Sequence, residues 1–171
     1  MYRQDLQDFA IFDGFTRQEV DQLTAVFEPC WFSHNTTIIE QGQPTDYLYI
    51  LSSGKVIIRY KPYDGPPFTF ATIDPGDVFG WSMALGRPVY TSAAIADQDC
   101  QAYRLSKERL IQMSDRCPDV VAVLMKRLVD RIIQRAQSAQ GDILNILMEG
   151  IDRNGNCIRR LNKNGKQRSK F

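Results

Sequence analysis

The chain has 171 residues, of which 43% are hydrophobic and 24% charged, a composition typical of one globular domain and not of a disordered chain. Residues 1–150 hold 14 Lys and Arg against 19 Asp and Glu, whereas residues 151–171 hold 7 against 1, so a body of charge −5 precedes a tail of +6. No apolar run is long enough to cross a bilayer and no secretory signal opens the chain, so we expect a cytoplasmic protein that does not bind membranes.

Histidine and cysteine usage argues against catalysis and against a metal site. His34 is the single histidine in the sequence, and the four cysteines have no Cys-x-x-Cys spacing. Metal centres and Ser-His or Cys-His nucleophiles need several such residues together. We therefore expect no enzyme, no catalytic residue and no metal. A cupin-type enzyme, which is another small β-barrel, is disfavoured because it needs about three metal ligands.

The first 29 residues predict a small helical element. A short helix is expected over residues 2–9. Thr16 and Glu19 have capping-box spacing, in which each side chain satisfies a free backbone N–H of the other residue. Apolar residues at helical spacing then carry the predicted helix through Phe27, and Pro29 ends it.

From about residue 31 to residue 105 the pattern is typical of an all-β sandwich or barrel. Short apolar runs alternate with Gly, Pro and Asp turns at intervals of roughly 8 to 12 residues. The predicted strands are residues 37–39, 47–51, 55–60, 68–73, 92–96 and 101–105. The fold class is therefore mostly β with flanking helices (α+β).

Helix is predicted again from Ser106, a candidate N-cap, to about Asp115, and from Pro118, at a favoured first position, to Glu149. At 1.5 Å per residue the second helix would be longer than one barrel needs. It carries two apolar faces, one of which should meet the barrel. We expect the other face to meet the same helix of a second copy of the chain. The predicted dimer interface is Val121, Leu124, Leu128 and Ile132; the alternative is a helix folded back entirely on its own subunit.

The domain organisation follows from these elements. Residues 1–150 form one domain that includes the long helix, and residues 151–171 form a basic tail predicted to be flexible. Cations of such a tail support only weak, salt-sensitive and sequence-independent contact with nucleic acid.

The segment from Phe79 to Ala93 carries the strongest functional signal. A strand leads through Gly80 into one predicted turn of helix, and a loop then leads to a strand that begins with small residues. Free N–H groups at the start of such a turn favour an anion such as phosphate. A strand-helix-strand connection without a ligand is the alternative.

Four motifs in order resemble the cyclic-nucleotide-binding domain of catabolite-activator and Fnr-like bacterial regulators. They are Glu40-x-Gly42, Tyr49-Ile50-Leu51-x-x-Gly54-x-Val56, Gly76-Asp77-x-Phe79-Gly80 and Ser92-Ala93. The resemblance implies a double-stranded β-roll or jelly roll with N-terminal helices, a small cassette helix and a long C-terminal dimerisation helix. It also implies a sensor domain whose phosphate-binding cassette contains Phe79, Gly80, Trp81, Ser82, Ala84, Leu85, Arg87, Thr91 and Ser92.

The sequence departs from the resemblance at the two polar anchors. Nucleotide-binding members have a glutamate for the ribose hydroxyl and, ten positions later, an arginine for the phosphate; Trp81 and Thr91 stand there. Losing two hydrogen bonds to charged groups costs roughly 3–6 kcal/mol, or two to four decades of affinity. Both cAMP and cGMP are therefore disfavoured. Arg87 and Arg59 are the candidate substitute cations.

Two further positions are implied by the resemblance, and Trp81 itself has two interpretations. In nucleotide-binding members the long helix covers the base, and alignment places Arg135 and Ala136 there. Trp81 is expected to fill the pocket or to join the core.

The leading hypothesis is a homodimeric sensor module that responds to an unknown small-molecule effector and signals through its long helix to a partner protein. The 21 residues after Gly150 are too few for the helix-turn-helix of the bacterial regulators, so this chain alone is not expected to bind specific DNA. One alternative is a Crp/Fnr-like transcription regulator that lacks its DNA-binding domain and binds cAMP or another effector through substitute residues. Another is an interaction scaffold without a ligand.

Overall fold

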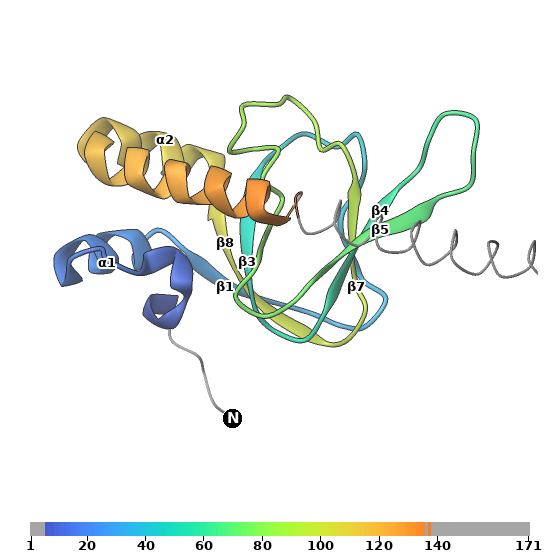
Figure 1. The fold of residues 1–171 in the computed structure, drawn as a ribbon, viewed down its shortest axis with the longest axis horizontal. Helices are drawn as coiled ribbons and strands as arrows, with labels where there is room; N and C mark the ends of the chain where they lie inside the picture. The colour runs from blue at the N-terminus through green and yellow to red at the C-terminus, as the bar shows by residue number, and fades with distance from the viewer. Residues whose placement is uncertain (1–5, 136, 138–171) are drawn as a thin grey trace, which may run out of the picture. The chain divides into compact units, whose positions relative to one another are not determined.

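The computed structural model describes residues 6–135 and 137. The chain divides into two compact units, residues 1–129 and 130–171, which are described separately. The first unit contains the predicted β-roll with its flanking helices (Figure 1). Its helical elements are η1 (Leu6–Asp8), η2 (Ala10–Phe12), α1 (Arg17–Thr24) and α2 (Lys107–Arg116). Its strands are β1 (Glu28–Phe32), β2 (Thr37–Ile39), β3 (Tyr47–Ser53), β4 (Val56–Tyr60), β5 (Phe68–Ile73), β6 (Val78–Phe79), β7 (Ala93–Ala96) and β8 (Cys100–Ser106).

The strands form two four-stranded antiparallel sheets, in the orders β1-β8-β3-β6 and β2-β7-β4-β5. Except for the hairpin of β4 and β5, neighbouring strands in the sheets are not consecutive in the sequence: Leu48 of β3 pairs with Leu105 of β8, and Ile57 of β4 pairs with Ile95 of β7. This arrangement confirms the predicted roll and its mostly β class.

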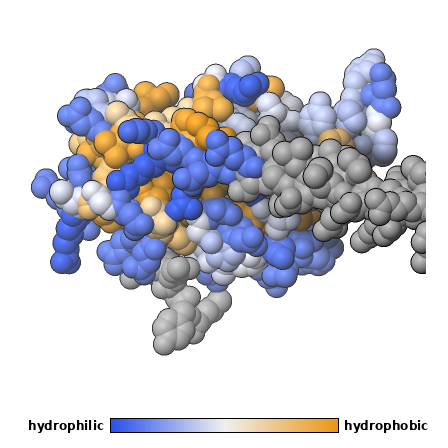
Figure 2. All heavy atoms as spheres, in the orientation of Figure 1, coloured by the Kyte–Doolittle hydropathy of each residue, from blue (hydrophilic) through white to orange (hydrophobic). Residues whose placement is uncertain are grey.

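Two hydrophobic clusters follow from the alternation of side chains along the strands. In β3, Leu48 and Ile50 point into a cluster shared with the helices, whereas Tyr49 and Leu51 point into a cluster shared with β2, β4, β5 and β7. We call these the helical core and the roll core. Figure 1 shows the helices gathered at one end of the molecule, and Figure 2 shows hydrophobic residues concentrated at that end.

The N-terminal element differs in detail from the prediction. Within the described residues the first helix is replaced by two 3-10 turns. The Thr16–Glu19 capping box is confirmed, since Thr16 N donates to Glu19 at 2.7 Å and Glu19 N donates to Thr16 Oγ1 at 3.3 Å. However, α1 ends at Thr24 and not at Phe27, because Phe27 turns into the helical core and packs edge-on against Phe12 at 6.1 Å.

The predicted N-cap at Ser106 is also confirmed, because its side chain accepts a hydrogen bond from Arg109 N and α2 follows. Residues 118–129 are helical, and helix is also assigned to residues 130–135 and 137 of the second unit. The rest of the predicted long helix, as well as the predicted tail over 151–171, lies outside the described residues.

The predicted dimer interface stays a prediction, and three of its four residues also pack within their own chain. Val121, Leu124 and Leu128 belong to the chain's own helical core, and the two leucines are only 1% exposed. They share this cluster with residues of α1 and of the sheet that contains β1. Within residues 118–129 the exposed apolar residues of this helix are Ala122, Val123 and Val129. Ile132 lies in the second unit.

Arg127 attaches this helix to the N-terminal element. Its guanidinium donates to the Ile11 carbonyl at 3.0 Å and lies over the Phe15 ring at 4.2 Å. A cation over an aromatic ring contributes roughly 0.5–2 kcal/mol, more when the pair is shielded from water. The beginning of the chain and the helix after Pro118 are therefore coupled by one side chain.

Candidate functional site

The candidate site is the segment between β6 and β7, and it begins at a glycine that no other residue could replace without strain. Gly80 has a φ of +74°, and a Cβ there would lie 2.9 Å from the Tyr47 carbonyl oxygen and 3.2 Å from the Tyr49 ring. Both the left-handed backbone and the close approach require glycine. Phe79, which precedes it, is buried and stacks on Tyr49 with ring centroids 4.8 Å apart.

The predicted cassette helix is not formed. Residues 81–86 are a series of hydrogen-bonded turns with a single i to i+4 bond, from Leu85 N to the Trp81 carbonyl at 3.1 Å. Gly86 N then bonds the Met83 carbonyl, and Arg87 N bonds the Ser82 carbonyl, each at 3.0 Å. The expected turn of helix is therefore present as an irregular loop that closes on itself.

The far end of this loop is tied to residues 42–47, which the sequence did not indicate as part of the site. Gly42 N donates to the Tyr90 carbonyl and Tyr90 N donates to the Gln43 carbonyl, both at 2.9 Å. The backbone N–H of the buried Thr45 donates to the Pro88 carbonyl at 3.2 Å. The Thr45 hydroxyl donates to the Arg87 carbonyl. The cassette is thus held in place by the protein's own backbone.

Tyr90 closes the same junction with its side chain. Its hydroxyl donates to the Tyr47 carbonyl at 2.6 Å and accepts from Tyr47 N at 2.9 Å, so one phenol satisfies both backbone groups of one residue. Burial raises the pKa of Tyr90, although its backbone hydrogen bonds oppose that shift. Tyr90 lies within the segment from Phe79 to Ala93 that the sequence singled out, but nothing local shows that its partner is 43 residues away.

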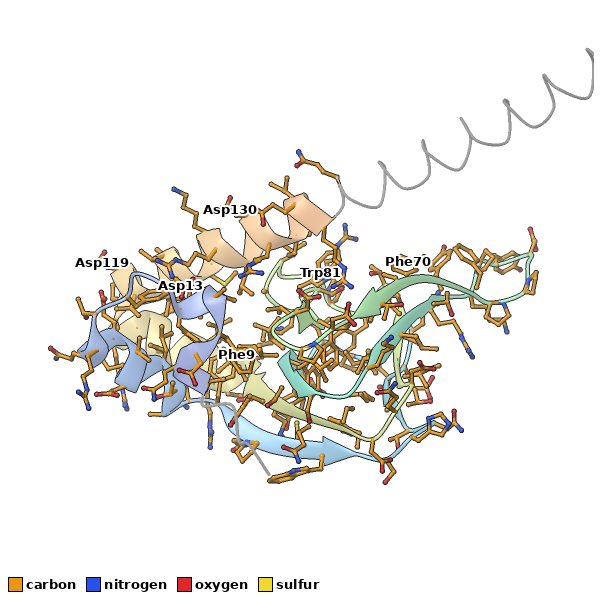
Figure 3. All side chains as sticks on the ribbon, turned by 60° about the horizontal axis from the view of Figure 1, so that its bottom comes forward. Phe9, Asp13, Phe70, Trp81, Asp119 and Asp130 are labelled. Atoms are coloured by element: carbon orange, nitrogen blue, oxygen red, sulfur yellow. The ribbon has the colours of Figure 1, made fainter. Side chains whose placement is uncertain are left out.

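Trp81 is packed against the helical core and not against the roll core. Met83 and Ala84 of the cassette join the same cluster, which also contains Leu124 and Leu128. Figure 3 labels Trp81 on its loop. Of the two predicted roles for Trp81, the structure thus favours that of a half-buried core aromatic. The side chain at the position of the family glutamate connects the cassette to the helix.

The other predicted cassette residues differ in how much of each is exposed to solvent. Ser82 is 5% exposed, and its backbone carbonyl accepts the hydrogen bond from Arg87 N. Ser92 is half-buried, whereas Leu85 and Thr91 are exposed. Among the described residues, no buried side-chain oxygen or nitrogen is left without a hydrogen-bond partner.

The two candidate substitute cations do not converge. Arg87 is exposed on the cassette loop, and Arg59 is exposed on β4, where it pairs with Ala93 and Thr69. Neither has an ion-pair partner within the described residues. Arg135 lies in the second unit, and Ala136 lies outside the described residues, so their positions relative to the cassette stay predictions.

A charged cluster that sequence reasoning missed lies at the end of the sheet that contains β1 and β8. Arg104 contacts Glu28 at 3.2 Å, Arg109 contacts the same carboxylate at 2.7 Å, and the Arg104 guanidinium lies 4.6 Å from the Tyr47 ring centroid. Desolvation opposes the charge of Arg104, but its hydrogen bond to Glu28 raises its pKa on balance. All three ionic side chains are about 40% exposed, so this cluster is a modest structural contribution.

The interior of the roll is aromatic, and burial there favours the protonated forms of a tyrosine hydroxyl and a cysteine thiol. Burial raises the pKa of the Tyr49 hydroxyl far above its usual range, and burial raises the pKa of the Cys30 thiol to about 11. Cys30 Sγ donates to the Ala102 carbonyl at 3.3 Å. Within residues 6–135 no group of three His, Cys, Asp or Glu side chains is placed to hold a metal, and no helix there is long and apolar enough to span a bilayer.

Comparison with known proteins agrees with this geometry. The family model "Cyclic nucleotide-binding domain" matches residues 29–117. The CRP-like cAMP-activated global transcriptional regulator of Mycobacterium tuberculosis is 27% identical over 134 residues, which are 78% of this chain and 59% of the relative. The cyclic AMP receptor protein of Thermus thermophilus is 28% identical over 122 residues, 69% of this chain and 56% of the relative. The chain thus spans less than two thirds of these relatives.

Solved structures show the same fold. A cyclic nucleotide-binding domain from Methylobacillus flagellatus superposes with a TM-score of 0.72 at 20% identity, covering 80% of this chain and 77% of the other. The Thermus thermophilus catabolite activator protein superposes with a TM-score of 0.65 at 27% identity, covering 79% and 62%. The family match and the fold agree, and the chain belongs to the cyclic nucleotide-binding domain family.

Proposed function

We propose that the protein is a non-catalytic regulatory sensor module that passes the state of its cassette to the helix after Pro118 and, through a homodimer, to a partner protein. The observation that carries this proposal is the shared helical core: Trp81 and Met83 of the cassette lie in one cluster with Leu124 and Leu128 of the helix. A displacement of the cassette would repack that cluster, because protein interiors are too dense to absorb it locally. The cytoplasmic location is part of the same proposal.

The homodimer would use the apolar residues that the helix leaves exposed. Val123 is 42% exposed and Val129 is 37% exposed, and Ala122 lies beside them. The relatives named as a cyclic AMP receptor protein and as a CRP-like regulator support a regulatory role for the chain. A ligand that binds one packing of the cassette more tightly would then shift the arrangement of the two helices.

The effector is proposed to be a molecule other than a cyclic nucleotide. Trp81 packs away from the roll and the exposed Thr91 offers no charge, so both family anchors are lost. A structural neighbour from Trypanosoma brucei is described as the regulatory subunit of a cAMP-independent protein kinase A, and a triple mutant of it is described as bound to cAMP. These descriptions support a cassette that changes its ligand through a few substitutions.

A second candidate function is that of the sensor part of a Crp/Fnr-like transcription regulator. The first relatives are named as transcriptional regulators, and the chain covers 59% and 56% of their length. In this case the partner that responds to the rearrangement of the helix would be a DNA-binding domain, and the cassette would function in the same way.

The test is a thermal-shift panel with cAMP, cGMP, cyclic dinucleotides and small anions on the wild type and on the double variant Trp81→Glu/Thr91→Arg. We expect no shift of the wild type with 1 mM cAMP and a clear shift of the double variant, because ligand stabilises by RT ln(1 + [L]/Kd). A matched control is Trp31→Glu/Thr69→Arg, which places the same charges on exposed strand positions. Stabilisation of the wild type by micromolar cAMP would contradict the proposed ligand class.

A further inference from the structure

The hairpin formed by β4 and β5 leaves its sheet beside the end of the cassette. β7 pairs with β4 only as far as Arg59, which lies opposite Ala93, the first residue of β7. Beyond Arg59, among the described strands, β4 pairs only with β5. Figure 1 shows the hairpin extending beyond the body of the roll. The sheet alone therefore does not fix the position of the hairpin relative to the cassette.

The side chain of Gln41 takes the place of the missing neighbour strand. Its Oε1 accepts a hydrogen bond from Lys61 N at 2.8 Å, and its Nε2 donates to the Lys61 carbonyl at 3.0 Å. One amide thus pairs with both backbone groups of a residue 20 positions away, as a residue of an antiparallel strand would. Gln41 lies two residues beyond the end of β2, and Lys61 directly follows β4.

The residues that follow Gln41 are bound to the cassette. Gly42 N donates to the Tyr90 carbonyl, and Tyr90 N donates to the Gln43 carbonyl, both at 2.9 Å. The turn is also closed on itself, since Gln43 N donates to the Glu40 carbonyl at 3.3 Å and Glu40 N donates to Gln43 Oε1 at 3.2 Å. One short hydrogen-bonded turn therefore contacts the hairpin through a side chain and the cassette through its backbone.

We propose that Gln41 is a positioning residue that couples the β4–β5 hairpin to the cassette, so that a displacement of the cassette moves the hairpin. Connected hydrogen-bond networks of this kind can carry energetic coupling between separate parts of a protein. The inference rests on the sensor function proposed above and adds a second route out of the cassette. This route is separate from the helical core, to which neither Gln41 nor Lys61 belongs. It ends at an aromatic surface, because Phe68 and Phe70 of β5 are each 51% exposed.

The test is hydrogen exchange of the full chain without a ligand, followed by mass spectrometry. Gln41→Ala should accelerate exchange in peptides that cover residues 57–63 at least tenfold, because it removes both bonds to Lys61. Since Gln41 is exposed, the variant keeps both cores intact. The matched control is Gln98→Ala, which removes an exposed glutamine from the turn between β7 and β8 and should leave the hairpin unchanged.

The coupling itself is measured by combining Gln41→Ala with a cassette variant. Tyr90→Phe removes the hydroxyl bonds to Tyr47 and leaves the hairpin untouched. In the wild-type background we expect it to accelerate exchange of the hairpin at least threefold. In the Gln41→Ala background it should have no further effect there, because the connection is already lost. The proposal is overturned by an effect that is equally large in both backgrounds, or by no effect in the wild type.

Gln41→Glu supplies a readout that a loss of packing would not give. A protonated glutamic acid can donate to the Lys61 carbonyl and accept from Lys61 N as the amide does, whereas the ionised form can only accept. A carboxyl group that faces a carbonyl oxygen titrates above the usual glutamate pKa of about 4.3. Compared with the wild type at the same pH, the hairpin of this variant should exchange within threefold at pH 4 and at least tenfold faster at pH 7.5.

Exchange of Gln41→Glu that matches Gln41→Ala at both pH values would show that the two amide bonds do not position the hairpin. None of these measurements involves a ligand. Their failure therefore leaves the thermal-shift test of the cassette unaffected, and failure of that test leaves the coupling between cassette and hairpin to be decided by exchange.

Discussion

Replacing Tyr90 by phenylalanine tests whether the cassette is held by the protein itself. The variant removes one hydroxyl and leaves the ring, so the roll core keeps its packing. It leaves the carbonyl and the N–H of Tyr47 without the partners that now lie at 2.6 and 2.9 Å. Leaving one buried polar group unpaired costs about 1–3 kcal/mol. Because the strand beside it is half-buried and water can reach part of the junction, we expect a loss of about 2 kcal/mol.

The assay is equilibrium urea unfolding followed by tryptophan fluorescence. We expect a lower midpoint with an unchanged m-value, which would report a change in stability and not in compactness. Tyr63→Phe is the matched control, because Tyr63 is fully exposed and should change stability by less than about 0.5 kcal/mol. Hydrogen exchange should also become faster over residues 80–90. If Tyr90→Phe lost no more stability than the control, the reasoning that this hydroxyl locks the cassette would be refuted.

Three further predictions concern the frame around the cassette. Gly80→Ala should destabilise the protein by at least about 2 kcal/mol, whereas Gly42→Ala should cost only about 1 kcal/mol. Both glycines have positive φ, but only a Cβ at Gly80 would meet backbone, at 2.9 Å. Equal losses in urea unfolding would contradict the steric argument. The Cys30 thiol, with a pKa of about 11, should react with iodoacetamide at pH 8 at least 100-fold more slowly in the folded than in the unfolded chain. Because folding raises this pKa, the contribution of the thiol to stability is complete below about pH 9 and is lost as the pH rises toward 11. Alkylation is followed by mass spectrometry, and rapid alkylation of the native protein would show that the thiol is exposed. Arg127→Met should cost about 1–2 kcal/mol and loosen the N-terminal element in hydrogen exchange, whereas Lys126→Met on the exposed side of the helix should do neither.

The parts of the fold that depend on neighbouring residues were predictable. The Thr16–Glu19 capping box and the Ser106 N-cap are short-range hydrogen bonds between residues three apart, so their spacing in the sequence suffices. The alternation of apolar residues and the turns with glycine predicted most of the strands, and the family resemblance implied that they form a roll. The lost anchors at Trp81 and Thr91 were also visible, because they depend only on residue identity at motif positions.

The structure of the cassette could not be predicted in the same way. A turn of helix was expected from the local sequence, but Thr45 and Tyr90 bind the loop to β3 and to the segment before it, and these bonds replace helical ones. The partners are more than 40 residues apart. No local pattern indicates such pairing, since it depends on how the sheets bring the segments together.

The same distinction explains the helix after Pro118. Its sequence alone determined that it is helical, that it begins at the proline and that it carries an apolar stripe. An apolar stripe does not determine which surface packs against it. The tertiary structure decided that Val121, Leu124 and Leu128 meet α1 and the neighbouring sheet, because those surfaces of the same chain are already close and cost no association entropy. It likewise decided that Trp81 turns toward this helix, and so placed the sensing loop and the helix in one core.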